Sequence, residues 1–217
     1  MKLIFIRHGQ AESNILGAKS CRIYDNYPLT KAGREQIFKT AKSISERYDG
    51  RIDEVFASPV LRTRQSAEII AKSLGISTGK IKFDERIKEI DFGDFNEKRG
   101  EISVELDEIF RAQIAGNLHI RMGYYGENNY EFQARLYRFL ADISDRYTTE
   151  NIVIVSHSSP IAVMEKALKK FLGDSNVRHH TVNGEIKEFE LSHNDHAKII
   201  HELTMLDNEI KNETYRG

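Results

Sequence analysis

The chain has 217 residues, of which 40% are hydrophobic and 30% are charged, so it can bury one sizeable core but is short for two full domains. Its 32 Lys and Arg balance 33 Asp and Glu to a net charge of −1, without a basic block that would favour nucleic acid or a membrane surface as partner. The single cysteine, Cys21, excludes an internal disulfide and a thiolate zinc site. The apolar run before Arg7 is too short for a secretory signal, so we expect a cytoplasmic protein; its oligomeric state stays open.

The first half of the chain alternates strand and helix patterns. The expected elements are a strand at 3–6, a helix at 30–48, a strand at 52–57, a helix at 61–74 and a short extended run at 81–83. Thr30 is suited to cap the first helix, and Gly75 stands where a helix C-cap prefers glycine. Such alternation of strands and helices is typical of an α/β fold.

The second half continues the alternation after a loop. The expected elements are an aperiodic loop at 86–100, helices at 102–115 and 130–147, a strand at 152–155, a helix ending near 172, and strands at 186–191 and 198–203. The β-branched run at 152–155 is typical of a strand that is buried on both faces. We therefore expect a single domain at 1–207 with a lid or insertion at about 100–129, followed by a loosely held polar tail at 208–217.

Cationic and imidazole side chains fall at the ends of these elements. Arg7 and His8 end the first strand, His157 follows a later strand, Arg62 begins a helix, and Glu89 lies in a loop. Because ligands bind beyond the carboxyl ends of parallel strands, these groups can face one crevice. Arginine and histidine there would neutralise a dianion such as a phosphate monoester, a neutral imidazole can attack phosphorus, and a carboxylate can protonate the departing alkoxide. The residue types therefore point to phosphoryl transfer.

The same segments resemble the histidine phosphatase superfamily, also called the phosphoglycerate mutase-like family. The matching stretches are RHGQAESN at 7–14, YPLTKAG at 27–33, SPVLRTRQSA at 58–67, KEIDFG at 88–93 and VSH at 155–157. The resemblance implies an α/β three-layer sandwich, in which a mainly parallel central sheet carries helices on both faces. This agrees with the alternation of strands and helices along the chain.

The resemblance also implies a role for each matching residue. His8 is the nucleophile that becomes phosphohistidine, and Arg7, Arg62 and His157 hold the phosphate around it. Glu89 is the general acid and later the general base. The family's chemistry implies neither a metal ion nor a cofactor.

Three further positions bear on substrate binding. Asn14 stands where the family places a side chain that helps to bind the transferred group, and Gln10 lies at the rim of the pocket. Ser158 replaces the glycine that usually follows the second histidine; its amide can still donate to phosphate, while its side chain narrows the pocket or adds a hydroxyl donor. The loop at 93–97 reads Gly-Asp-Phe-Asn-Glu where the family usually has Gly-x-Trp-Glu-Gly, so Glu97 replaces the final glycine. We expect the core chemistry to be intact. These departures leave undetermined which leaving group the site prefers.

Other polar and aromatic residues have simpler interpretations. Arg64 is expected on the solvated face of its helix. The histidine-rich stretches at 178–180 and 193–196 lack the spacing of a metal site and are expected to form polar turns. Tyr124 and Tyr125 either line the substrate side of the pocket or pack within the lid.

Three functions stay open at this point. The first is a metal-independent phosphatase that hydrolyses a small phosphomonoester through a phosphohistidine, with a phosphoprotein as the other substrate class. The second is a phosphoglycerate mutase-type phosphotransferase, although the segment at 100–129 is short for the arginine-bearing insertion of cofactor-dependent mutases. The third is a phospho-ligand binding protein with weak or lost turnover, which only Ser158 and the altered loop at 96–97 favour.

Overall fold

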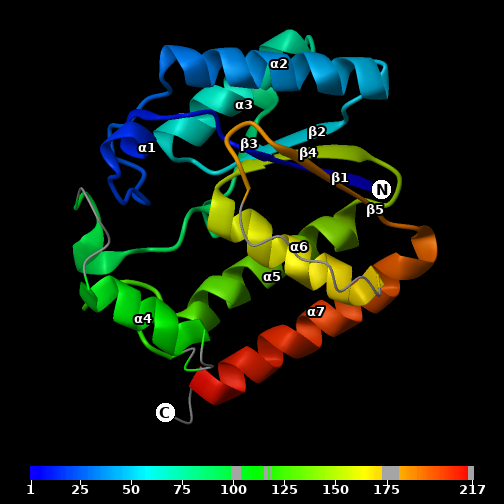
Figure 1. The fold of residues 1–217 in the computed structure, drawn as a ribbon. Helices are drawn as coiled ribbons and strands as arrows, with labels where there is room; N and C mark the ends of the chain where they lie inside the picture. Colours follow the sequence, from blue (N-terminus) through cyan, green and yellow to red (C-terminus); the bar gives the residue numbers. More distant parts are fainter. Residues whose placement is uncertain (99–103, 115–116, 118, 173–180, 215–217) are drawn as a thin grey trace.

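A five-stranded sheet forms the centre of the fold. The computed structural model describes residues 1–98, 104–114, 117, 119–172 and 181–214 (Figure 1). The strands, in the spatial order β3-β2-β4-β1-β5, are β1 (Lys2–Arg7), β2 (Glu54–Ala57), β3 (Lys82–Phe83), β4 (Asn151–Ser156) and β5 (Ile186–Glu190). β1, β2, β3 and β4 run parallel, whereas β5 pairs with β1 in the antiparallel sense. The expected mainly parallel sheet is confirmed.

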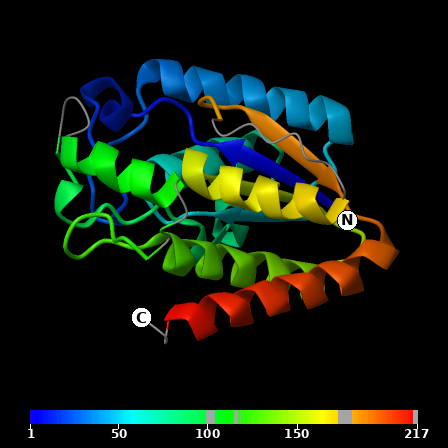
Figure 2. The same cartoon turned by 60° about the horizontal axis from the view of Figure 1, so that its bottom comes forward.

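Helices cover both faces of the sheet, as expected for a three-layer α/β sandwich. The helices are α1 (Glu12–Leu16), α2 (Lys31–Tyr48), α3 (Leu61–Ser73), α4 (Val104–Ile114), α5 (Asn129–Arg146), α6 (Ser158–Leu172) and α7 (His193–Thr214). Short 3₁₀ turns occupy Thr78–Lys80, Glu85–Ile87 and Gly93–Phe95. In both views α2 and α3 lie on one side of the sheet and α5 and α6 on the other, with α7 running beside α5 (Figures 1 and 2).

The central strands are buried on both faces, and their side chains alternate between two cores. Leu3 and Phe5 of β1 belong to the core under α5 and α6, whereas Ile4 and Ile6 belong to the core under α2 and α3. This alternation follows from the two-residue period of a strand, and it explains why β1 reads as an unbroken apolar run. The sandwich is therefore encoded in the strands themselves.

Local capping fixes the starts and ends of the helices. The Thr30 hydroxyl accepts a hydrogen bond from the Gly33 amide at 3.0 Å, so the expected cap of α2 is confirmed. Gly75, just beyond α3, has a left-handed φ of 71°, which a glycine adopts without steric cost. Asn128 and Glu131 form a reciprocal capping box at the start of α5. These caps agree with the boundaries read from the sequence to within a few residues.

The C-terminal segment differs from the expectation. The predicted strand at 198–203 is wrong, because α7 spans this stretch and continues to Thr214, through part of the expected polar tail. Ile199 and Leu203, four residues apart, are both buried against α5, which is helical spacing. The stretch at 193–196 forms the first turn of this helix rather than a polar turn, and 178–180 lies outside the described residues. Within the described ranges, no helix combines the length and apolar character needed to cross a bilayer.

Candidate active site

Three of the sequence-predicted site residues meet at the carboxyl ends of neighbouring strands. His8 follows β1, His157 follows β4, and Arg62 lies in the first turn of α3. β1 and β4 are parallel, with Arg7 opposite Ser156, so the next residue of each strand falls at the same edge of the sheet. The two imidazole rings lie 5.2 Å apart in an edge-to-face arrangement. His8, Arg62 and His157 are 2%, 4% and 0% exposed, so they form a buried cluster.

Hydrogen bonds fix the tautomer of His8. Its Nδ1 lies 2.7 Å from the Gly9 carbonyl oxygen, to which it donates, because a carbonyl can only accept. Its Nε2 therefore carries a lone pair, which accepts a hydrogen bond from Arg62 Nε at 3.0 Å. Burial, and then the charge of Arg62, hold the pKa of His8 well below its ordinary value. His8 is thus a neutral imidazole whose Nε2 carries no proton and accepts the hydrogen bond of Arg62.

Arg62 connects the two histidines. Its Nη2 donates to His157 Nδ1 at 2.9 Å and to the Ser20 carbonyl at 2.8 Å, and its Nη1 donates to the Ser20 hydroxyl at 2.9 Å. Burial lowers the pKa of Arg62 to about 10, while Glu89 and Asp25 act in the opposite direction. The guanidinium therefore stays charged at neutral pH in a site from which water is largely excluded, where its attraction for an anion is strong.

His157 has the opposite tautomer to His8. Since its Nδ1 accepts from Arg62, its Nε2 carries the proton and donates to the Ser58 hydroxyl at 2.9 Å. Burial, followed by the charge of Arg62, lowers the pKa of His157 well below its usual range. His157 is therefore a neutral ring, and hydrogen bonds to Arg62 and Ser58 set its orientation.

Arg7, beside this cluster, has an N–H group that makes no hydrogen bond to the described residues. One of its terminal nitrogens, Nη1, donates to the Thr181 carbonyl, whereas its buried Nε has no hydrogen-bond partner among the described residues. Burial lowers the pKa of Arg7, while the carboxylates of Glu89 and Glu185 raise it. A buried guanidinium N–H without a partner costs free energy, and an anionic ligand would remove that cost.

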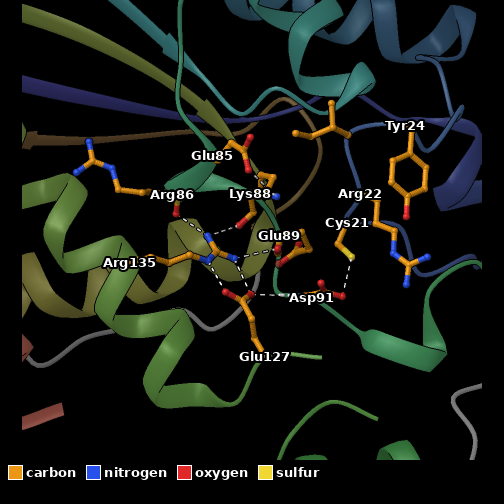
Figure 3. Close-up of a pocket in the computed structure, with 11 residues that line it drawn as sticks. Cys21, Arg22, Tyr24, Glu85, Arg86, Lys88, Glu89, Asp91, Glu127 and Arg135 are labelled. Carbon is orange, nitrogen blue, oxygen red and sulfur yellow. Dashed lines mark hydrogen bonds and ion pairs between the residues drawn. The ribbon is translucent and has the colours of Figure 1, made fainter. Parts of the chain in front are cut away.

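Glu89 lines a cleft of about 480 Å³ (Figure 3). The cleft is lined by side chains from 21–24 and 85–91 together with Glu127 and Arg135. The Glu89 carboxylate accepts a hydrogen bond from the Ile90 amide at 3.1 Å, and it raises the pKa of both Arg7 and Arg62. The cleft therefore carries a carboxylate whose charge acts on both arginines.

The other sequence-predicted residues are more peripheral. Gln10 accepts from the Thr30 hydroxyl at 2.9 Å, and the exposed Asn14 accepts from the Ala11 amide at 2.9 Å. The Gln10 side chain therefore bonds to the start of α2, whereas the Asn14 oxygen also accepts from Asn183, whose amide donates to the His8 carbonyl. The Ser158 hydroxyl, at the start of α6, lies 3.3 Å from the amide of Thr181, the residue that also binds Arg7.

Two glycines let the loop after β1 lie against α2. A Cβ on Gly33 would lie 2.8 Å from the carbonyl carbon of Gln10 and nearer still to its oxygen, and a Cβ on Gly9 would meet the Gly33 carbonyl in the same way. Only glycine permits backbones to approach this closely. The glycines of the first two matching stretches thus set the path of the chain on either side of His8.

The altered loop after Glu89 remains attached to the site. Asn96 accepts from the Cys21 amide at 3.1 Å, which fixes the segment that begins with Ser20. Glu97 adopts a left-handed φ of 65°, a conformation that favours glycine. The backbone therefore keeps a conformation suited to glycine although a glutamate occupies the position.

Arg64, Tyr124 and Tyr125 lie away from the cluster. Arg64 is exposed, with its guanidinium 5.1 Å from the centre of the Phe83 ring, so the expected solvated position is confirmed. Tyr124 and Tyr125 are 77% and 76% exposed and pack edge to face against each other. Neither tyrosine lines the cleft beside Glu89.

Sequence reasoning gave no role to three loop residues that contact Arg62, Arg7 or His8. Ser20 binds two nitrogens of Arg62, Thr181 binds Arg7, and the Asn183 side-chain amide donates to the His8 carbonyl at 2.9 Å. All three lie in loops. The sequence carries one related signal, an Asn-Gly pair at Asn183 that is typical of a turn, but nothing in it indicates that this turn would reach His8.

Known proteins resemble the chain in sequence and fold. It is 26% identical over 160 residues to the probable phosphoglycerate mutase GpmB of Salmonella choleraesuis, covering 72% of this chain and 69% of that protein. It is 27% identical over 169 residues to phosphoserine phosphatase 1 of Hydrogenobacter thermophilus, covering 77% and 76%.

Solved structures share the fold. A phosphoserine phosphatase from Entamoeba histolytica, in complex with 3-phosphoglyceric acid, matches with a TM-score of 0.67 at 25% identity over 87% of this chain and 90% of that one. Bacillus stearothermophilus YhfR matches in fold with a TM-score of 0.71 at 23% identity, over 88% and 91%. The family model of the histidine phosphatase superfamily, branch 1, matches residues 3–201. The chain therefore belongs to the histidine phosphatase superfamily.

Proposed function

We propose that this protein is a metal-independent phosphatase that hydrolyses a small phosphomonoester through a phosphohistidine at His8. The observation that carries the proposal is the state of the His8 ring. Its Nδ1 donates to the Gly9 carbonyl and its pKa is held low by burial and Arg62, so that Nε2 is an unprotonated nucleophile at neutral pH.

In the first half-reaction, His8 Nε2 attacks phosphorus as the bond from phosphorus to the ester oxygen breaks. Arg62 Nε exchanges its hydrogen bond to His8 for one to a phosphoryl oxygen, and the unpartnered Nε of Arg7 binds the same group. Glu89, in its protonated form, gives its proton to the departing alkoxide, which leaves through the adjoining cleft.

In the second half-reaction, the Glu89 carboxylate takes a proton from water, and the resulting hydroxide attacks phosphorus. The bond from phosphorus to His8 Nε2 breaks, inorganic phosphate leaves, and both His8 and Glu89 return to their starting protonation states. The two guanidinium groups supply the positive charge that the dianion requires, so the proposed cycle uses no metal ion.

A mutase is the second candidate, because one relative is named a probable phosphoglycerate mutase and another a phosphoserine phosphatase at nearly equal identity. The two activities share the first half-reaction and differ in the acceptor of the phosphoryl group. We favour water as the acceptor, since the segment at 100–129 is short for the arginine-bearing insertion of cofactor-dependent mutases.

A screen of phosphomonoesters in the presence of a chelator tests this proposal. The panel should include phosphoserine and 3-phosphoglycerate, the latter with and without a bisphosphorylated primer. We expect chelator-resistant phosphate release that His8→Ala abolishes. Arg64→Lys should retain it, because this exposed arginine lies on the same helix as Arg62 but outside the cluster. Phosphate release by His8→Ala at the wild-type rate would contradict the proposal. Primer-dependent isomerisation would favour the mutase, and tight binding of a phosphopeptide without turnover would favour a binding protein.

A further inference from the structure

The backbone that carries Glu89 is held from behind by one arginine. Arg135 of α5 donates from Nη1 to the carbonyl oxygens of Arg86 and Lys88, the latter at 2.9 Å, and from Nη2 to the carbonyl oxygen of Glu89 at 3.0 Å (Figure 3). A guanidinium can serve several carbonyl groups at once because its donors lie in one rigid plane. Arg135 therefore fixes the main chain up to and including Glu89.

Glu127 holds the other side of the same segment. Its carboxylate accepts from the Asp91 amide at 2.9 Å, and its own amide donates to the Asp91 carbonyl at 3.0 Å. The same carboxylate binds Arg135 through two hydrogen bonds, of 2.7 and 2.9 Å. The pair thus flanks Ile90: Arg135 bonds to the main chain at Glu89 and Glu127 bonds to it at Asp91 (Figure 3).

This support replaces the regular structure that the segment lacks. Glu89 and Asp91 lie between two 3₁₀ turns, outside any helix or strand. The Glu89 carboxylate accepts a hydrogen bond from the neighbouring Ile90 amide, so the position of the carboxylate follows the position of the main chain. The side chains of Arg135 and Glu127 are only 15% and 21% exposed, so the ion pair is shielded from solvent.

We infer that Arg135 and Glu127 are positioning residues that hold Glu89 where it can transfer a proton to and from the leaving group. The inference rests on the proposed function, because it takes Glu89 as the proton donor. Neither residue touches the phosphoryl group in this account. Replacing either partner should therefore weaken proton transfer by Glu89 and should leave the binding of phosphate unchanged.

The acidity of the leaving group separates this role from a general loss of structure. Phenyl phosphate has a weakly acidic leaving group and requires a proton donor, whereas the leaving group of 2,4-dinitrophenyl phosphate departs without one. The measured quantity is kcat/KM, which reports the first half-reaction. The variants are Arg135→Lys, which keeps the charge but loses the planar set of donors, Glu127→Gln, and Glu89→Gln. Arg146→Lys is the matched control, since its ion pair with Asp142 lies on the exposed face of the same helix.

For Glu89→Gln we expect a loss of about 100-fold on phenyl phosphate and only a few-fold on the dinitrophenyl ester. For Arg135→Lys and for Glu127→Gln we expect kcat/KM to fall about 10-fold on phenyl phosphate. On the dinitrophenyl ester, each variant should lose less than about 2-fold. In the Glu89→Gln background, Arg135→Lys should cause no additional loss on phenyl phosphate, because it acts through Glu89. Arg146→Lys should match the wild type on both.

Equal losses on the two esters, or an additional loss in the Glu89→Gln background, would overturn the inference. So would wild-type rates for Arg135→Lys on both esters. Failure of the proposed function has a different signature, namely His8→Ala hydrolysing both esters as fast as the wild type. A crystal structure of Arg135→Lys gives a readout that does not depend on activity: we expect the Glu89 main chain to be displaced, and an unmoved Glu89 would contradict the inference.

Discussion

Acid should destabilise this protein through its two buried histidines. Burial, and then the charge of Arg62, hold the pKa of His8 and of His157 well below the ordinary value. In the unfolded chain each imidazole titrates near pH 6.5. Below that pH the unfolded chain binds protons that the folded chain excludes, so this contribution to stability is complete above about pH 7 and is lost as the pH falls.

The size of the effect follows from proton counting. Each histidine that stays neutral in the folded state lowers the free energy of unfolding by about 1.4 kcal/mol per pH unit below its unfolded pKa. For two rings that both stay neutral in the folded state, the limit is about 2.7 kcal/mol per unit, or at most about 4 kcal/mol between pH 7 and 5 once partial protonation near pH 6.5 is included. Domains are typically stable by about 5–15 kcal/mol, so this loss approaches the whole stability of a domain at the lower end of that range.

Urea unfolding at half-unit steps from pH 7 to 5 measures this slope. The comparison uses the wild type, His8→Gln, His157→Gln and the double variant, so that contributions from carboxylates are common to all four proteins. We expect each single replacement to reduce the slope between pH 6 and 5 by about 1.2 kcal/mol per unit, and the double replacement to reduce it by about twice that amount. Equal slopes in all four proteins would refute the reasoning, because the folded state would then bind the same protons as the unfolded chain.

Three further substitutions test the local structure. Gly33→Ala should lower the free energy of unfolding by about 2–3 kcal/mol in urea because its Cβ collides with backbone, whereas Gly79→Ala, whose Cβ meets nothing closer than 3.7 Å, should not; equal stabilities would contradict the close approach. Glu97→Gly should raise the free energy of unfolding by about 0.5–1 kcal/mol by relieving the left-handed φ, while Glu97→Gln should not; a gain with Gln instead would point to charge. Arg62→Lys should reduce kcat/KM by about 100-fold or more, and Arg64→Lys by less than about 2-fold. Similar losses in the two variants would show that activity does not depend on the buried cluster.

The adjacency of His8 and His157 follows from topology that the sequence reveals. Each histidine comes directly after an apolar run, and buried runs of this kind form parallel strands. Once β1 and β4 pair in register, the residues that follow them share one edge of the sheet. Arg62 follows the same logic, since it begins the helix after β2.

Contacts made by loops could not be predicted in this way. Ser20, Thr181 and Asn183 contact Arg62, Arg7 and His8, respectively, but their local sequence has no periodicity that would place them. Their positions depend on pairings between segments far apart in the chain. Such pairings are set by tertiary packing and leave no local pattern.

The strand expected at 198–203, which is part of α7, has a local cause in the sequence. Two adjacent isoleucines, Ile199 and Ile200, favour a strand locally. The helix is instead indicated by Asp195, whose carboxylate accepts from the amide and the hydroxyl of Ser192 at the helix start. The four-residue spacing of Ile199 and Leu203 indicates it as well. Burial against α5 decides between the two patterns, and the longer helical period prevails.

Trapping the covalent intermediate tests the central claim most directly. The protein is mixed with a radiolabelled phosphomonoester, quenched in base within the first turnover, and digested, and the labelled peptide is identified by mass spectrometry. We predict an acid-labile, base-stable label on His8 that forms at a rate equal to or faster than turnover and is lost in His8→Ala. A label on another residue, or full turnover by a protein that forms no label, would contradict the account.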